Sequence, residues 1–121
     1  MAKRILIIDD DVLTSEVMKH ALEVEGYEIV TAPNGVEGLA KARDEKPDLV
    51  VLDVMLPGLD GYEVCHRLRE APQTADLPIL MLSAKAREVD VETGRRMGAN
   101  VFLTKPLDPS ALVAQVGALL A

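Results

Sequence analysis

Residues 48–53 read Asp-Leu-Val-Val-Leu-Asp, and this stretch decides the class of fold. Its four consecutive apolar residues indicate a strand that is buried on both faces, which is typical of the centre of a parallel sheet. Outward from it, short apolar runs alternate with segments of helical periodicity. The predicted strands are 5–8, 28–32, 48–53, 77–82 and 101–104, and the predicted helices are 14–25, one marked by 36–42, 62–70, 88–97 and 110–120.

The order of these elements is a strand followed by a helix, repeated five times. Such alternation requires a mostly parallel sheet, because each crossover helix returns the chain to the same end of the sheet. We therefore predict an α/β fold with a doubly wound, five-stranded parallel sheet and helices on both faces. The 121 residues, 49% of them apolar, are enough for one domain, and we expect it to cover residues 1–121.

The composition excludes several classes of function. A net charge of −7 argues against direct binding of nucleic acid, whose phosphates would repel the chain. The single cysteine, Cys65, excludes an internal disulfide and a cysteine-based zinc site, and nothing contradicts a cytoplasmic location. No stretch approaches the roughly 20 apolar residues of a membrane span. No G-x-G-x-x-G motif follows the first predicted strand, which argues against a dinucleotide cofactor.

Polar residues stand at the carboxyl ends of four predicted strands. These are Asp9-Asp10-Asp11, Asp53, Ser83 and Lys105. In a doubly wound sheet the carboxyl ends of the strands are where ligands bind, so these side chains should gather at one edge. Clustered carboxylates repel one another, and a bound cation relieves that repulsion. Because the candidate ligands are oxygen atoms only, they favour Mg²⁺ or a similar hard ion.

A carboxylate beside a divalent cation and an ammonium can attack phosphorus and form an aspartyl phosphate. The ammonium of Lys105 would balance the charge of the phosphoryl oxygens, and the hydroxyl of Ser83 would donate a hydrogen bond to one of them. The residues therefore indicate phosphoryl transfer to an aspartate.

Four motifs carry a resemblance to a known family. They are 7–11 (Ile-Ile-Asp-Asp-Asp), 52–61 (Leu-Asp-Val-Met-Leu-Pro-Gly-Leu-Asp-Gly), 81–84 (Met-Leu-Ser-Ala) and 102–106 (Phe-Leu-Thr-Lys-Pro). In this order and at these spacings they resemble the receiver domain of two-component response regulators, in particular the chemotaxis type. The resemblance covers essentially the whole chain, and it implies the flavodoxin-like strand order 2-1-3-4-5.

The resemblance also implies a phosphoacceptor and a metal site. Asp53 would accept a phosphoryl group from the phosphohistidine of a sensor histidine kinase or of a histidine phosphotransfer protein. Mg²⁺ would be held by Asp10, by Asp53 and by the backbone carbonyl of Met55, with Asp9 acting through a water molecule. Met55 and Lys85 stand at positions that influence hydrolysis of the phosphoaspartate in this family. Such a protein is a signalling module that catalyses only its own phosphorylation and dephosphorylation.

The remaining implied roles concern the fifth strand. Lys105 would pair with a phosphoryl oxygen, and the bond between Lys105 and Pro106 would be cis. On phosphorylation, Ser83 would move toward the phosphoryl group and Phe102 would turn inward. The face formed by the fourth helix, fifth strand and fifth helix would then change and be read by an output domain or protein. Phe102 could equally be a core residue without a switching role.

Simpler readings and other functions stay open. Asp11 is expected to cap a helix, and Cys65 to lie half-buried. A small phosphatase of the haloacid dehalogenase type would use the pattern Asp9-x-Asp11, but it needs a further acidic pair after Lys105 and leaves Asp53 without a role. A receiver fold that is never phosphorylated is another alternative. The last predicted helix carries no charge, so we expect a monomer or a weak dimer, either free-standing or part of a longer regulator.

Overall fold

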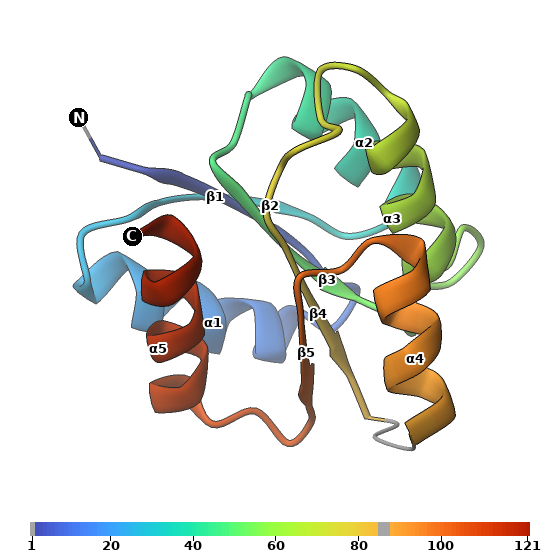
Figure 1. Ribbon diagram of the computed structural model, residues 1–121. Helices are drawn as coiled ribbons and strands as arrows, with labels where there is room; N and C mark the ends of the chain where they lie inside the picture. Colours follow the sequence, from blue (N-terminus) through green and yellow to red (C-terminus); the bar gives the residue numbers. More distant parts are fainter. Residues whose placement is uncertain (1, 85–87) are drawn as a thin grey trace.

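The computed structural model describes residues 2–84 and 88–121. The described chain forms a parallel sheet of order β2-β1-β3-β4-β5, with helices on both of its faces (Figure 1). The predicted α/β class and strand order are thereby confirmed. The strands are β1 (Arg4–Ile8), β2 (Glu28–Ala32), β3 (Leu49–Asp53), β4 (Ile79–Ser83) and β5 (Val101–Thr104), and the helices are α1 (Val12–Val24), α2 (Gly35–Asp44), α3 (Gly61–Glu70), α4 (Glu88–Met97) and α5 (Pro109–Leu120).

Two apolar layers fill the space between the sheet and its helices. Helices α1 and α5 cover one face, and helices α2, α3 and α4 cover the other. Along β1, Ile5 and Ile7 pack toward α1 and α5, whereas Leu6 and Ile8 pack toward the opposite helices. All residues of β3 are buried, which confirms the interpretation of the apolar run at 49–52 as a central strand.

Short polar side chains begin four of the helices. Asp11, Asn34, Asp60 and Asp108 each accept a backbone N–H from the first turn of the helix that follows. Each such bond satisfies a donor that has no partner inside the helix. The expected capping role of Asp11 is confirmed, and because of it α1 begins at Val12 rather than at residue 14.

The fourth strand begins at Ile79 rather than at residue 77. The backbone N–H of Leu77 donates to the carbonyl of Thr74 at 3.2 Å, so Leu77 closes a turn instead of joining the sheet. The carbonyl of Leu77 is one of several acceptors around the guanidinium of Arg69. The others are the carbonyls of Thr74, Ala75 and Gly98 and the side-chain oxygen of Asn100. Arg69 thus ties the end of α3 to the segments that lead into β4 and β5.

Cys65 is fully buried on α3, which corrects the expectation that it would lie half-buried. Helix α4 covers it, and its thiol donates to the carbonyl of Met97 at 3.3 Å. Burial raises the pKa of the thiol to about 11. Cys65 therefore stays protonated and joins α3 to α4. Within residues 2–84 and 88–121, no helix has the length and apolar character needed to cross a bilayer.

Candidate functional site

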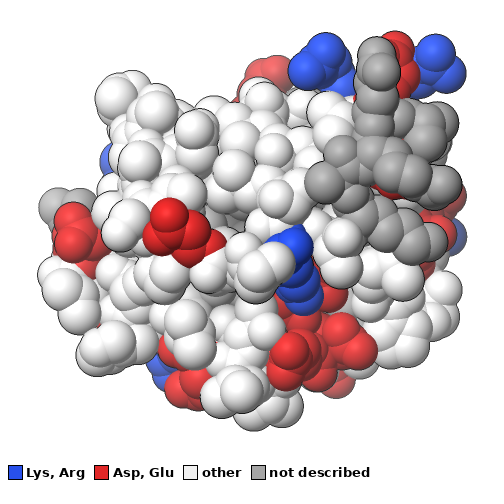
Figure 2. Space-filling model, turned by 90° about the horizontal axis from the view of Figure 1, so that it is seen from below, with Lys and Arg blue, Asp and Glu red and all other residues white. Residues whose placement is uncertain are grey.

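Three carboxylates gather at the carboxyl edge of the sheet, and we call this group the acidic pocket. Asp9 and Asp10 follow β1, and Asp53 ends β3; one oxygen from each lies within 4.8 Å of the others. Asp9 and Asp53 are buried, with 4% and 2% of their surface exposed, whereas Asp10 faces solvent. Figure 2, which views the molecule from below, shows several acidic side chains gathered next to a basic one.

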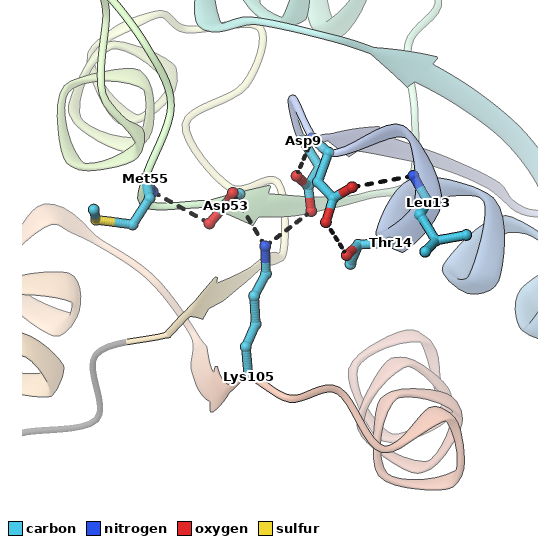
Figure 3. Close-up of polar contacts among 7 residues, drawn as sticks. Asp9, Leu13, Thr14, Asp53, Met55 and Lys105 are labelled. Atoms are coloured by element: carbon cyan, nitrogen blue, oxygen red, sulfur yellow. Dashed lines mark hydrogen bonds and ion pairs between the residues drawn. The ribbon is translucent and has the colours of Figure 1, made fainter.

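Lys105 supplies a positive charge to this pocket. Its ammonium lies 3.3 Å from Asp53 Oδ2 and 3.4 Å from Asp9 Oδ2 (Figure 3). The backbone N–H of Lys105 donates to the carbonyl of Ser83 at 2.8 Å, which places the residue at the end of β5. The peptide bond between Lys105 and Pro106 is cis. Burial disfavours the charged ammonium, but Asp53 and Asp9 outweigh it and raise the pKa of Lys105.

The carboxylates carry more negative charge than Lys105 balances. Burial raises the pKa of Asp9, and the charge of Asp53 raises it further; the backbone N–H of Asp11, 2.9 Å from Asp9 Oδ1, and the ammonium of Lys105 only partly oppose this. Two buried carboxylates and an exposed one around a single ammonium leave a net negative site made only of oxygen donors. This donor set fits a hard divalent cation.

The loop after β3 fixes the backbone around Asp53. Asp53 Oδ1 accepts the backbone N–H of Met55 at 3.2 Å. Gly61, the first residue of α3, donates its N–H to the carbonyl of Val54 at 3.0 Å. A Cβ on Gly61 would collide with the carbonyl oxygen of Asp53, so α3 can begin this close to β3 only with glycine. The motif 52–61 does not reveal this contact, because the contact depends on how closely α3 approaches β3.

The other candidate residues lie on the two strands at this edge of the sheet. Ser83 is fully buried at the end of β4, beside Thr104 of β5. Phe102 is partly buried and packs into the core layer under α2, α3 and α4, with Met81 as its register partner on β4. Lys85 lies outside the described residues. Asp11 turns toward α1, where the hydroxyl of Thr14 donates to it at 2.6 Å and lowers its pKa.

Comparison with known proteins agrees with this geometry. Residues 5–117 match the family described as the response regulator receiver domain. The chain is 48% identical over 120 residues to the alkaline phosphatase synthesis transcriptional regulatory protein PhoP of Bacillus subtilis, and it spans 49% of that protein's length. It is 38% identical to protein PilH of Pseudomonas aeruginosa, covering 98% of both chains. A solved response regulator from Chloroflexus aurantiacus superposes with a TM-score of 0.95 at 40% identity, over 99% of this chain and 98% of that one.

The chain belongs to the family of response regulator receiver domains. It is a signalling module rather than a true enzyme, and a switch driven by phosphorylation is typical of the family. The acidic pocket is consistent with the metal site of receivers, and receiver domains interact with histidine kinases.

Proposed function

We propose that residues 1–121 form one receiver domain that acts as a phosphorylation-dependent switch, with Asp53 as the phosphoacceptor. The donor would be a sensor histidine kinase or a histidine phosphotransfer protein. The observation that supports this most directly is the environment of Asp53, which is buried, ends the central strand and lies 3.3 Å from the ammonium of Lys105. Its carboxylate is thus held beside a fixed positive charge at the edge where parallel sheets bind ligands.

The proposed reaction transfers a phosphoryl group between two side chains. An oxygen of Asp53 attacks phosphorus, the P–N bond of the donor phosphohistidine breaks, and its electron pair stays on the imidazole nitrogen. The ammonium of Lys105 balances the charge on the phosphoryl oxygens. The hydroxyl of Ser83 donates a hydrogen bond to another of these oxygens.

Several residues of the pocket would hold Mg²⁺. Asp10, Asp53 and the backbone carbonyl of Met55 would be its direct ligands, and Asp9 would contribute through a water molecule. When bound, Mg²⁺ supplies positive charge opposite the phosphoryl oxygens. The excess negative charge of the acidic pocket supports this assignment.

Apolar side chains around the acidic pocket support docking of a protein donor. Val12 and Leu13 at the start of α1 are 75% and 74% exposed, and Met55 is 52% exposed. Large apolar side chains grouped at a polar site are typical of protein interfaces. A docked partner would cover them while its phosphohistidine reached Asp53.

The output of the switch would be the face formed by α4, β5 and α5. In this proposal Ser83 follows the phosphoryl group, and the ring of Phe102 changes position with it. Phenylalanine has no hydroxyl, so this face would present an apolar ring to an output domain or protein. The phosphatase alternative has less support, because the carboxylate of Asp11 caps α1.

The test is the intact mass of the protein after incubation with acetyl phosphate and Mg²⁺. We expect one added phosphoryl group on the wild type, none after addition of EDTA, and none on Asp53→Asn. The matched control is Asp11→Asn, which makes the same change at a capping residue and should still be phosphorylated. An adduct that survives Asp53→Asn but is lost in Asp9→Asn would support the phosphatase. No adduct on the wild type with acetyl phosphate or several kinases, despite measured Mg²⁺ binding, would indicate a receiver fold that is never phosphorylated.

A further inference from the structure

Helix α4 contains a glycine that its backbone does not require. Gly94 lies in the interior of the helix, where glycine is destabilising relative to alanine. The glycines with positive φ are Gly26, Gly58 and Gly98, so left-handed backbone geometry does not explain Gly94. Gly94 is also buried, facing the sheet. The reason for this glycine must therefore lie in what the helix packs against.

What it packs against is the ring of Phe102. A Cβ on Gly94 would lie 2.9 Å from Cδ2 and 3.2 Å from Cε2 of that ring, and 3.0 Å from the sulfur of Met81. Met81 is fully buried on β4, beside Phe102 in the register of the two strands. Gly94 and Met81 thus form a seat for the ring, which we call the ring seat. The seat has no room for a methyl group on α4.

Helix α4 is held where it is on both sides of Gly94. The hydroxyl of Tyr62 on α3 donates to the carbonyl of Asp90 at 3.2 Å, and the thiol of Cys65 on α3 donates to the carbonyl of Met97 at 3.3 Å. These two bonds resist movement of the helix away from the sheet. An added methyl group would therefore displace the ring of Phe102 rather than the helix.

A displaced ring has a defined place to go. A hollow of about 230 Å³ lies between α4 and β5, and its lining includes Phe102 itself. Its other lining residues are Val91, Arg95, Ala99, Asn100 and Val101. Movement of the ring into this hollow would change the surface that α4 and β5 present to a partner.

We propose that Gly94 is a positioning residue that keeps the ring of Phe102 inward, and that the size of residue 94 sets how far the ring turns out. The consequence for signalling rests on the proposed function, because it assumes that partners read this face. The position of the ring does not rest on the proposed function, because it is a property of the unphosphorylated fold.

Fluorine NMR can test the ring seat directly. Phe102 is the single phenylalanine of the sequence, so labelling with 4-fluorophenylalanine gives one signal from the ring itself. We expect Gly94→Ala to shift this signal and to increase its change between H₂O and D₂O, because the ring becomes more exposed. The matched control is Gly117→Ala on α5, where no atom lies within 4 Å of the added Cβ, and it should leave the signal unchanged. A Gly94→Ala signal with the wild-type position and solvent response would overturn the proposal.

A double-mutant cycle gives a second, independent test. We expect Gly94→Ala to lower the urea midpoint in the wild type but to raise it in a Phe102→Ala background. The control Gly117→Ala should raise the midpoint in both backgrounds. If Phe102→Ala does not fold, Phe102→Leu serves as the background without a ring. The same midpoint change from Gly94→Ala in both backgrounds would refute the ring seat.

The phosphorylation assay on the same samples keeps the two proposals apart. Absence of a phosphoryl adduct on the wild type would count against the proposed function. Only the fluorine signal and the double-mutant cycle decide the role of Gly94.

Discussion

Replacing Asp10 with asparagine removes one negative charge from the acidic pocket with almost no change in side-chain size. Its carboxylate lies within 4.8 Å of those of Asp9 and Asp53. Asp10 has no ion pair with Lys105 among the described contacts, whereas Asp9 and Asp53 both do. Neutralising Asp10 therefore relieves repulsion without breaking either ion pair, and we expect Asp10→Asn to stabilise the metal-free fold.

The magnitude follows from the separation of the charges. At 4.8 Å, one repulsive pair costs roughly 0.9 kcal/mol in bulk water and roughly 3.5 kcal/mol at an effective dielectric constant of about 20. Asp10 faces solvent, so each of its two pairs lies near the lower figure. We expect a net gain in the free energy of unfolding of about 1–2 kcal/mol, or about 4–8 °C in melting temperature for a domain of this size.

The assay is thermal and urea denaturation in EDTA at low salt, repeated with Mg²⁺. At ten times its dissociation constant, a bound ion stabilises the wild type by about 1.4 kcal/mol, and Asp10→Asn should lose most of that gain. The matched control is Asp11→Asn, because asparagine is an equally good helix cap and Asp11 lies outside the acidic pocket. The reasoning is refuted if Asp10→Asn melts at or below the wild type in EDTA, or if Mg²⁺ stabilises both equally.

Three further predictions concern other described residues. Burial and the charge of Asp53 raise the pKa of Asp9 above 3.8, so the folded state keeps this proton to a higher pH than the unfolded chain does. The stability of the wild type should therefore fall as pH rises through the window above 3.8. Urea titrations of Asp9→Asn over the same window should not show this fall. Arg69→Met should cost about 3 kcal/mol or more in urea unfolding, because the guanidinium donates to three carbonyls on the two segments that lead into β4 and β5. Arg69→Lys should restore only part of this loss. The thiol of Cys65, with a pKa of about 11, should react with Ellman's reagent at pH 8 at least about 100-fold more slowly than in the unfolded chain.

Each of these predictions has an outcome that contradicts it. Parallel pH profiles of stability for the wild type and Asp9→Asn would show that folding does not raise the pKa of Asp9. A loss below about 1 kcal/mol in Arg69→Met would mean that solvent replaces its hydrogen bonds at little cost. Rapid labelling of Cys65 in the native protein would show that α4 separates from α3 in solution.

The strands and the edge that bears the site were predictable because parallel sheets leave a clear pattern. A strand buried on both faces needs an unbroken apolar run, as at 49–52, and the carboxyl ends of such strands meet at one edge. Asp9, Asp53 and Lys105 could therefore be placed together before their distances were known. The strand order came from the family resemblance, because periodicity carries no information about which strands are neighbours.

What the sequence could not predict depends on partners distant along the chain. In the sequence, Arg69 looks like any other charged residue of an amphipathic helix. Its acceptors lie on turns, and local sequence patterns do not predict where those turns run. Gly94 looks only like a destabilising residue within α4, because the ring that explains it belongs to Phe102 on the next strand. Cys65 was expected to be half-buried, because the pattern of α3 alone does not show that α4 covers it.

The ion pairs of Lys105 join residues that leave the ribosome far apart in time. Lys105 and Asp9 are separated by 96 positions, and Lys105 and Asp53 by 52. A nascent chain that has not yet released β5 from the ribosome can hold the acidic residues but not the ammonium between them. Contacts of such long sequence separation form late, because the intervening loop must first be closed. Under the proposed function, competence to react would be acquired only when β5 has docked, so a half-made copy would not compete with finished molecules for the phosphoryl donor.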